Sequence, residues 1–141
     1  MARTRPAPPA PRAAGRESVL SAAIAEGEAL WAQGKSLEAL RVFERIVKNH
    51  VWGPAYERAL FGLGHCHAAA DRPEQALAAW EDALKKSRLL QAGDYADDCL
   101  LAQADTWLNA LDRPARARAC AERLLADYPE SGLRGRAEHL L

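Results

Sequence analysis

The sequence is poor in the residue types that build β-sheets. Val, Ile and Thr together occupy only 8 of its 141 positions, whereas Ala occupies 31 and Leu 19. Strands depend on branched and aromatic side chains that pack on a pleated surface, and aromatic residues make up only 6% of this chain. Alanine and leucine are strong helix formers. The composition therefore excludes an all-β fold and predicts a single all-α domain.

The chain also lacks long apolar runs and paired cysteines. Its longest uninterrupted apolar stretches are only four or five residues, as at 99–102 and 76–80, far below the roughly 20 residues that span a bilayer. Its three cysteines, Cys66, Cys99 and Cys120, are an odd number without C-x-x-C spacing, which favours buried, reduced thiols. We therefore expect no membrane span and a cytoplasmic location.

A net charge of zero conceals two oppositely charged segments. Residues 1–16 contain four arginines, no acidic residue and half of the eight prolines, so their charge is +4. The remaining residues, 17–141, carry 15 basic and 19 acidic side chains, which gives −4. The first segment has no periodic apolar face to bury, which predicts a disordered Pro/Arg-rich tail before a helical domain at 17–141. The balanced charge argues against a surface for specific nucleic-acid binding.

A repeat runs through the helical domain. Apolar residues spaced 1, 4, 7 and 8 positions from the first member form one stripe along a helix. This pattern begins at Ala39, recurs in full from Ala76, and recurs in part from Ala117. Another apolar helical segment precedes each copy. The sequence therefore predicts three antiparallel helical hairpins, at about 18–50, 54–90 and 94–128, and a further helix at 130–141.

Turn residues separate the two helices of each hairpin. Gly34 precedes the first copy of the pattern, and an Asp-Arg-Pro triplet precedes each of the other two. Proline is favoured in the first turn of a helix, and the aspartate of each triplet, Asp71 or Asp112, is expected to cap the exposed N–H groups. Gly27 and Gly64 precede the first two copies of the pattern by the same interval. This shared register suggests small residues where the paired helices cross closely.

The repeat resembles the tetratricopeptide repeat (TPR) of bacterial-type proteins. In that family the first helix of each repeat has a small residue near its end. The second helix has an alanine, then an aromatic residue about one helical turn after the alanine, and then another small residue nearly one turn further on. Repeat two matches with Gly64, Ala76, Trp80 and Ala83. The resemblance covers about residues 18–129 and implies an α-solenoid of three hairpins closed by a C-terminal capping helix.

The third repeat departs from the family pattern. Ala117 and Pro129 match, but Ala121 replaces the aromatic, and Asp105 occupies the position of the glycine. A buried carboxylate is costly without a partner. Either the third repeat is splayed at this point, or the register there is off by one.

The resemblance implies a partner-binding groove lined by the first helix of each repeat. Residues at inward positions would offer aromatic rings, one arginine and neutral hydrogen-bonding groups to a peptide or helix. These groove residues are Glu28, Trp31, Arg58, Phe61, His65, Gln103, Thr106 and Asn109. The alternative is that Trp31 and Phe61 only fill the seam between neighbouring hairpins.

No catalytic or metal-binding constellation stands out in the sequence. The histidines of His65-Cys66-His67 diverge around a helix, whereas metal-binding histidines need i, i+4 spacing to share a face. The family's carboxylate-clamp positions hold Ile24, Glu28, Gly62 and Cys99, so that clamp is absent. We expect no cofactor, no metal and no enzymatic activity.

Two hypotheses for function follow from the resemblance. The first is a non-enzymatic adaptor or scaffold that binds a peptide or helix of a protein partner in the concave groove. The second is a structural or self-associating subunit of a larger envelope-related or secretion-related assembly. In the second hypothesis, Trp52 and Leu140-Leu141 are candidate contact residues of a homo-oligomer.

Overall fold

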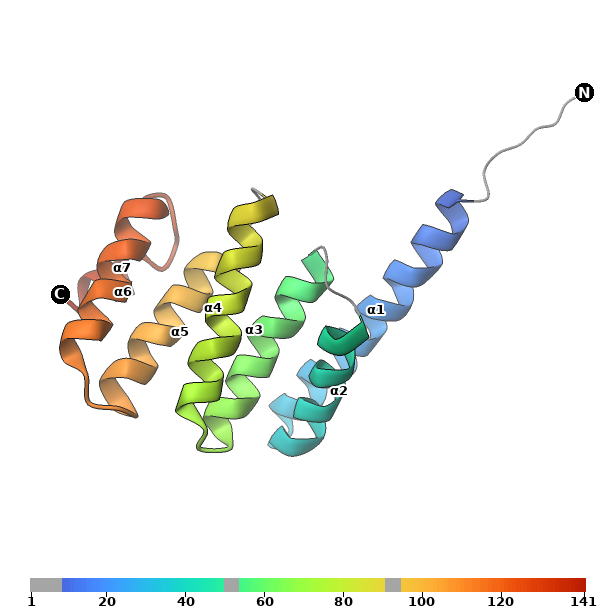
Figure 1. The fold of residues 1–141 in the computed structure, drawn as a ribbon, viewed down its shortest axis with the longest axis horizontal. Helices are drawn as coiled ribbons and strands as arrows, with labels where there is room; N and C mark the ends of the chain where they lie inside the picture. Colours follow the sequence, from blue (N-terminus) through green and yellow to red (C-terminus); the bar gives the residue numbers. More distant parts are fainter. Residues whose placement is uncertain (1–8, 50–53, 91–94) are drawn as a thin grey trace, which may run out of the picture.

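The computed structural model describes residues 9–49, 54–90 and 95–141, and in these residues every regular element is a helix. Consecutive helices run antiparallel and stand side by side in one row (Figure 1). The first three pairs are hairpins, and a short helix follows them. The prediction of an all-α solenoid is therefore confirmed. The elements are α1 (Pro9–Ala32), α2 (Ser36–Asn49), α3 (Pro54–Ala69), α4 (Pro73–Leu90), α5 (Ala96–Asn109), α6 (Pro114–Asp127) and α7 (Arg134–Glu138).

The first helix begins earlier than the sequence pattern predicted. α1 starts at Pro9, so residues 9–16 are helical rather than part of a disordered tail, and residues 1–8 lie outside the described part of the chain. Pro9 and Pro11 both fall in the first turn of α1, where a missing N–H costs little. The residues that follow are mainly alanine and arginine, which are strong helix formers. Figure 1 shows this end of α1 projecting beyond the row of helices.

The turns inside the three hairpins share one backbone conformation. Gly34, Asp71 and Asp112 all have positive φ, at 79°, 61° and 52°. These residues close the preceding helices in the left-handed conformation that commonly ends helices. The expected aspartate cap at the start of α6 is absent, because the N-cap residue is Arg113 and it makes no side-chain cap bond. The aspartates therefore serve as turn residues.

Aromatic rings from the second helices fill the crossings of the first two hairpins. The Phe43 ring of α2 lies against the backbone of Gly27 in α1 and of Gly62 in α3. A Cβ added at Gly27 would lie 2.8 Å from Phe43 Cζ, and one added at Gly62 would lie 2.6 Å from the same atom. These distances are too short for real Cβ contacts. The glycines are thus required by the ring of Phe43.

The third hairpin keeps the register but lacks the ring. Leu101 and Ala104 are buried, as are Leu60 and Leu63 at the equivalent positions of α3, so the register predicted for Asp105 holds. With Ala121 in place of an aromatic, no ring covers position 105. The Asp105 carboxylate is only half-buried and accepts a hydrogen bond from Arg136 at 3.5 Å.

The C-terminal helix is shorter than expected. α7 comprises Arg134–Glu138 instead of residues 130–141, because the segment after Pro129 first makes turns, with the Ser131 N–H donating to the Tyr128 carbonyl. Ala137 is nevertheless fully buried against the core, and Leu133 and Leu140 pack at its edge. α7 therefore covers the end of the third hairpin. Trp52, a candidate contact residue, lies outside the described residues.

Candidate functional site

A hollow of about 440 Å³ opens between α1 and α3. Its walls are predominantly apolar, with the carboxylate of Glu28 at the edge. Trp31 is 44% exposed, although large aromatic side chains of this kind are usually buried. The lining residues are Glu28, Trp31, Ala32, Phe43, Phe61, Gly62 and His65.

His65 stands at the centre of an aromatic cluster next to this hollow. Its ring centroid lies 4.5 Å from that of Phe61, with the two rings perpendicular, and 5.5 Å from that of Trp31. On the inner side the ring of Trp80 lies 5.3 Å away. Edge-to-face contacts of this kind hold aromatic rings in fixed orientations. Burial among these rings lowers the pKa of His65 below its ordinary value, so the imidazole is neutral near pH 7.

An ion pair links the two helices beside the hollow. The Arg58 guanidinium donates to both carboxylate oxygens of Glu28, from Nε at 3.0 Å and from a terminal nitrogen at 2.6 Å. The hydrogen bonds to Glu28 raise the pKa of Arg58. Two-point contacts of this kind fix the orientation of both side chains. Glu28 therefore lies at the edge of the hollow with its charge largely balanced by Arg58.

The structure brings five of the eight predicted groove residues together. Glu28, Trp31, Arg58, Phe61 and His65 surround the hollow or its edge.

The other three predicted residues lie on α5, away from the hollow. Gln103 is only 5% exposed, and its amide donates to the Leu77 carbonyl and to Glu81 on α4, so its predicted place in a groove is wrong. Thr106 is also buried, with its hydroxyl donating to the Ala102 carbonyl. Asn109 is exposed at the end of α5.

Sequence reasoning missed two kinds of residue at the site. Phe43 forms the floor of the hollow, but its position in the stripe of α2 identified it only as a core residue. Tyr95 lies just before α5 with its ring 5.2 Å from Phe61, and its non-helical position carries no periodic signal. The glycine at position 62 was the available signal for the floor, because its missing side chain leaves room for the ring of Phe43 against the backbone of α3.

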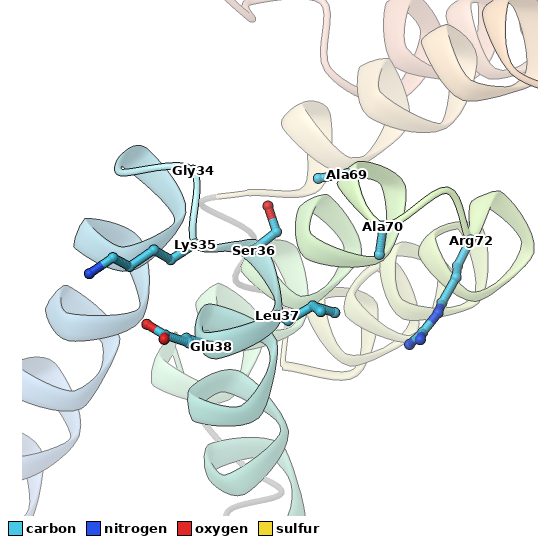
Figure 2. Close-up of a pocket in the computed structure, with 8 residues that line it drawn as sticks. All are labelled: Gly34, Lys35, Ser36, Leu37, Glu38, Ala69, Ala70 and Arg72. Carbon is cyan, nitrogen blue, oxygen red and sulfur yellow. The ribbon is translucent and has the colours of Figure 1, made fainter.

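A second, wider hollow of about 600 Å³ lies among the interhelical turns (Figure 2). Leu37 of α2 points across it toward Ala70 and Arg72. Figure 2 shows the side chains of Lys35 and Glu38 directed away from the α3–α4 turn. Because its polar groups do not converge, this hollow is the weaker candidate for recognition.

The three side chains of the His65-Cys66-His67 segment lie in three different environments. Cys66 is fully buried, as expected of a small hydrophobic side chain, and burial raises its pKa to about 11. His65 belongs to the aromatic cluster, whereas His67 lies partly exposed with its Nδ1 buried. Within the described ranges, no group of three or more His, Cys, Asp or Glu residues could hold a metal ion.

Comparison with known proteins identifies the repeats. One model of the tetratricopeptide repeat family matches residues 24–97, which run from α1 into α5, and a second matches residues 98–131, which contain most of α5 and all of α6. The chain belongs to the tetratricopeptide repeat family. TPR repeats generally mediate protein–protein interaction, and TPR proteins are typically interaction modules rather than enzymes. No curated protein matches this TPR chain. Among the helices that the structure describes, none is long and apolar enough to cross a membrane.

Proposed function

We propose that this TPR protein is a non-enzymatic adaptor that holds a peptide or helix of a protein partner at the hollow between α1 and α3. The observation that supports this most directly is the exposure of Trp31 beside Phe61 over an apolar floor. Aromatic side chains dominate binding energy at protein interfaces when a partner covers them. An apolar anchor residue of the partner would fill the hollow.

The walls of the hollow are held in place before a partner arrives. His65 contacts both Trp31 and Phe61, and the Glu28–Arg58 pair ties α1 to α3. A site that is already ordered loses little conformational freedom on binding. The polar groups at its edge would hydrogen-bond to the backbone of the bound segment.

Selection from a displayed peptide library, followed by calorimetry with the selected synthetic peptides, tests this proposal. We expect peptides with a large apolar residue, whose affinity falls at least about tenfold in Trp31→Ala and in Phe61→Ala. Trp107→Ala is the matched control, because Trp107 is a partly exposed tryptophan that does not line the hollow. The proposal fails if the selected peptides bind the Trp31→Ala and Trp107→Ala variants equally.

We also propose that the protein acts in the cytoplasm. The cysteines Cys66, Cys99 and Cys120 are unpaired, and two of them are buried, which suits a reducing compartment. Fractionation of cells that express the chain, followed by immunodetection, tests this location. Recovery in an extracytoplasmic fraction would contradict it.

A further inference from the structure

His65 places a proton-binding side chain in the wall of the hollow between α1 and α3. Its ring contacts those of Trp31 and Phe61, the two rings at which the partner's anchor is proposed to bind. Trp80 of α4, which does not line the hollow, contacts it from another side. His65 is only partly buried, so water still reaches it in the free protein. Binding at the hollow therefore changes the surroundings of His65 directly.

The charged groups near the hollow do not compensate a proton on His65. Besides Trp31 and Phe61, the neighbouring elements present to His65 or to the hollow around it Glu28, Phe43, Arg58, Trp80 and Tyr95. Among these, Glu28 and Arg58 are charged, and the two hydrogen bonds between them leave the pair without net charge. A protonated imidazole would thus find no unpaired carboxylate in this set of residues.

Loss of hydration decides the preferred form of the imidazole. Aromatic faces attract cations, and four rings of this kind surround the site. The pKa of His65 is nevertheless lowered from its ordinary value, and burial is the cause. The hydration that the imidazolium loses therefore outweighs its attraction to the rings.

An apolar anchor in the hollow would remove the remaining water from His65. A neutral imidazole tolerates this loss, whereas an imidazolium loses hydration that no neighbouring charge replaces. The complex therefore binds a proton at His65 more weakly than the free protein does. By thermodynamic reciprocity, a proton on His65 weakens the binding of the anchor by the same factor.

We propose that His65 makes partner binding at the hollow sensitive to pH, so that acidification releases the partner's apolar anchor. This inference rests on the proposed adaptor function and adds a control to its site. The affinity is complete while the imidazole is neutral in both the free protein and the complex. It falls once the pH drops to the pKa of His65 in the free protein, which lies below 6.5.

His67 offers a matched comparison on the same helix. Burial also lowers its pKa, and the charges that act on it are those of Glu44 and Arg72. It lines neither of the two hollows described above. A proton on His67 therefore affects the stability of the protein without entering the wall at which the anchor binds.

Calorimetry at a series of pH values tests the proposal. The probe is a capped synthetic peptide from the library selection that has no titratable side chain, so a change in affinity reports on the protein. Between about pH 7.5 and 5 we expect Kd to rise at least about threefold, with a limit of about tenfold per pH unit for a single proton. Circular dichroism of the same samples checks that the protein stays folded.

Variants of His65 separate the proton from the ring. His65→Phe keeps an aromatic ring between Trp31 and Phe61 but cannot titrate, so it should bind the peptide without pH dependence. His65→Gln, which also cannot titrate, serves the same purpose if the larger ring prevents folding. His67→Gln should keep the pH dependence of the wild type. PH dependence that persists without His65, or that disappears in His67→Gln, would overturn the proposal.

NMR of the imidazole Cε1–H signals measures the coupling directly. The signal of His65 is identified by its loss in His65→Gln, and its titration midpoint should move to lower pH when the peptide is bound. The midpoint of His67 should stay in place. An unchanged midpoint of His65 in the saturated complex, with binding that still requires Trp31, would refute the pH control alone. Peptides that bind Trp31→Ala and Trp107→Ala equally would refute the adaptor site and this inference with it.

Discussion

Gly64 of α3 lies flat against the indole ring of Trp80 in α4. A Cβ added at Gly64 would lie within 2.5 Å of Trp80 Cε2, which no real structure tolerates without movement. Trp80 is 1% exposed, and its Nε1 donates a hydrogen bond of 3.1 Å to the Phe61 carbonyl. The indole therefore cannot shift without breaking that bond. Gly64 and Trp80 act as one packing unit, as Gly27 and Phe43 do in the first hairpin.

Gly64→Ala is expected to destabilise the protein. Alanine is favoured over glycine inside a helix by about 1 kcal/mol, but overpacking a rigid core costs typically about 1–3 kcal/mol. Because the ring of Trp80 is fixed, we expect the overpacking to dominate and the midpoint of urea unfolding to fall. The shift of that midpoint relative to wild type, followed by circular dichroism, is the measurement.

Gly135→Ala provides the matched control for this substitution. Gly135 also lies in a helix, α7, but a Cβ there would meet nothing within 4 Å. This variant should unfold at the same or a higher urea concentration than wild type. If Gly64→Ala were as stable as Gly135→Ala, the close contact with Trp80 would have no energetic weight.

The sequence was sufficient to predict the fold because its signals are local. Apolar spacing marked the helices, and Gly34 with the two Asp-Arg-Pro triplets marked the turns. The start of α1 was missed because residues 1–16 have no periodic apolar face, which predicted a disordered tail, although Pro9 and Pro11 fit in a first helical turn. For the glycines, the sequence showed the shared register but not the rings that require it, because Phe43 and Trp80 lie on the other helix of each hairpin.

The Glu28–Arg58 ion pair is expected to contribute little to stability. Their side chains are 45% and 41% exposed, and solvent screening limits such pairs to about 0.2–1 kcal/mol. A double-mutant cycle with Glu28→Gln and Arg58→Met should therefore give a coupling free energy in this range. The coupling should weaken further at high salt, because both charges face solvent. A coupling of several kcal/mol that is independent of salt would contradict this account.

The cysteine thiols are expected to be unreactive in the folded protein. Burial raises the pKa of Cys66 to about 11 and raises that of Cys99 as well, so few thiolates form near neutral pH. Alkylation by iodoacetamide, read by peptide mass spectrometry, should modify both residues only in denaturant. Cys120 is partly exposed and should be modified first. Rapid modification of Cys66 under native conditions would show that α3 opens readily.

The site was less predictable than the fold because groove positions depend on packing between repeats. Trp31, Phe61 and His65 were found because the family register carries over well in the first two hairpins. Gln103 was misplaced because its position faces the preceding helix α4, where the equivalent residue in α3 is Gly62. A polar residue type alone did not show that its amide was already satisfied inside the core.

His65 is expected to make stability depend on pH. Burial lowers the pKa of His65 below its ordinary value of 6.5, and burial also lowers that of His67. The unfolded chain therefore binds more protons than the folded chain once the pH falls below about 6.5, and the free energy of unfolding decreases there. Above that pH both histidines are neutral in the folded chain and in the unfolded chain, so they no longer lower the free energy of unfolding.

The size and the origin of this pH effect can be separated by one substitution. Each histidine contributes at most about 1.4 kcal/mol per pH unit in the window between its folded and unfolded pKa. Urea unfolding of wild type and His65→Gln between about pH 5.5 and 7.5 measures the slope. The variant should show a shallower slope than wild type, with the remainder due mainly to His67. Identical slopes in the two proteins would mean that the ring of His65 accepts a proton without leaving its aromatic neighbours, and that its burial does not penalise the charged form.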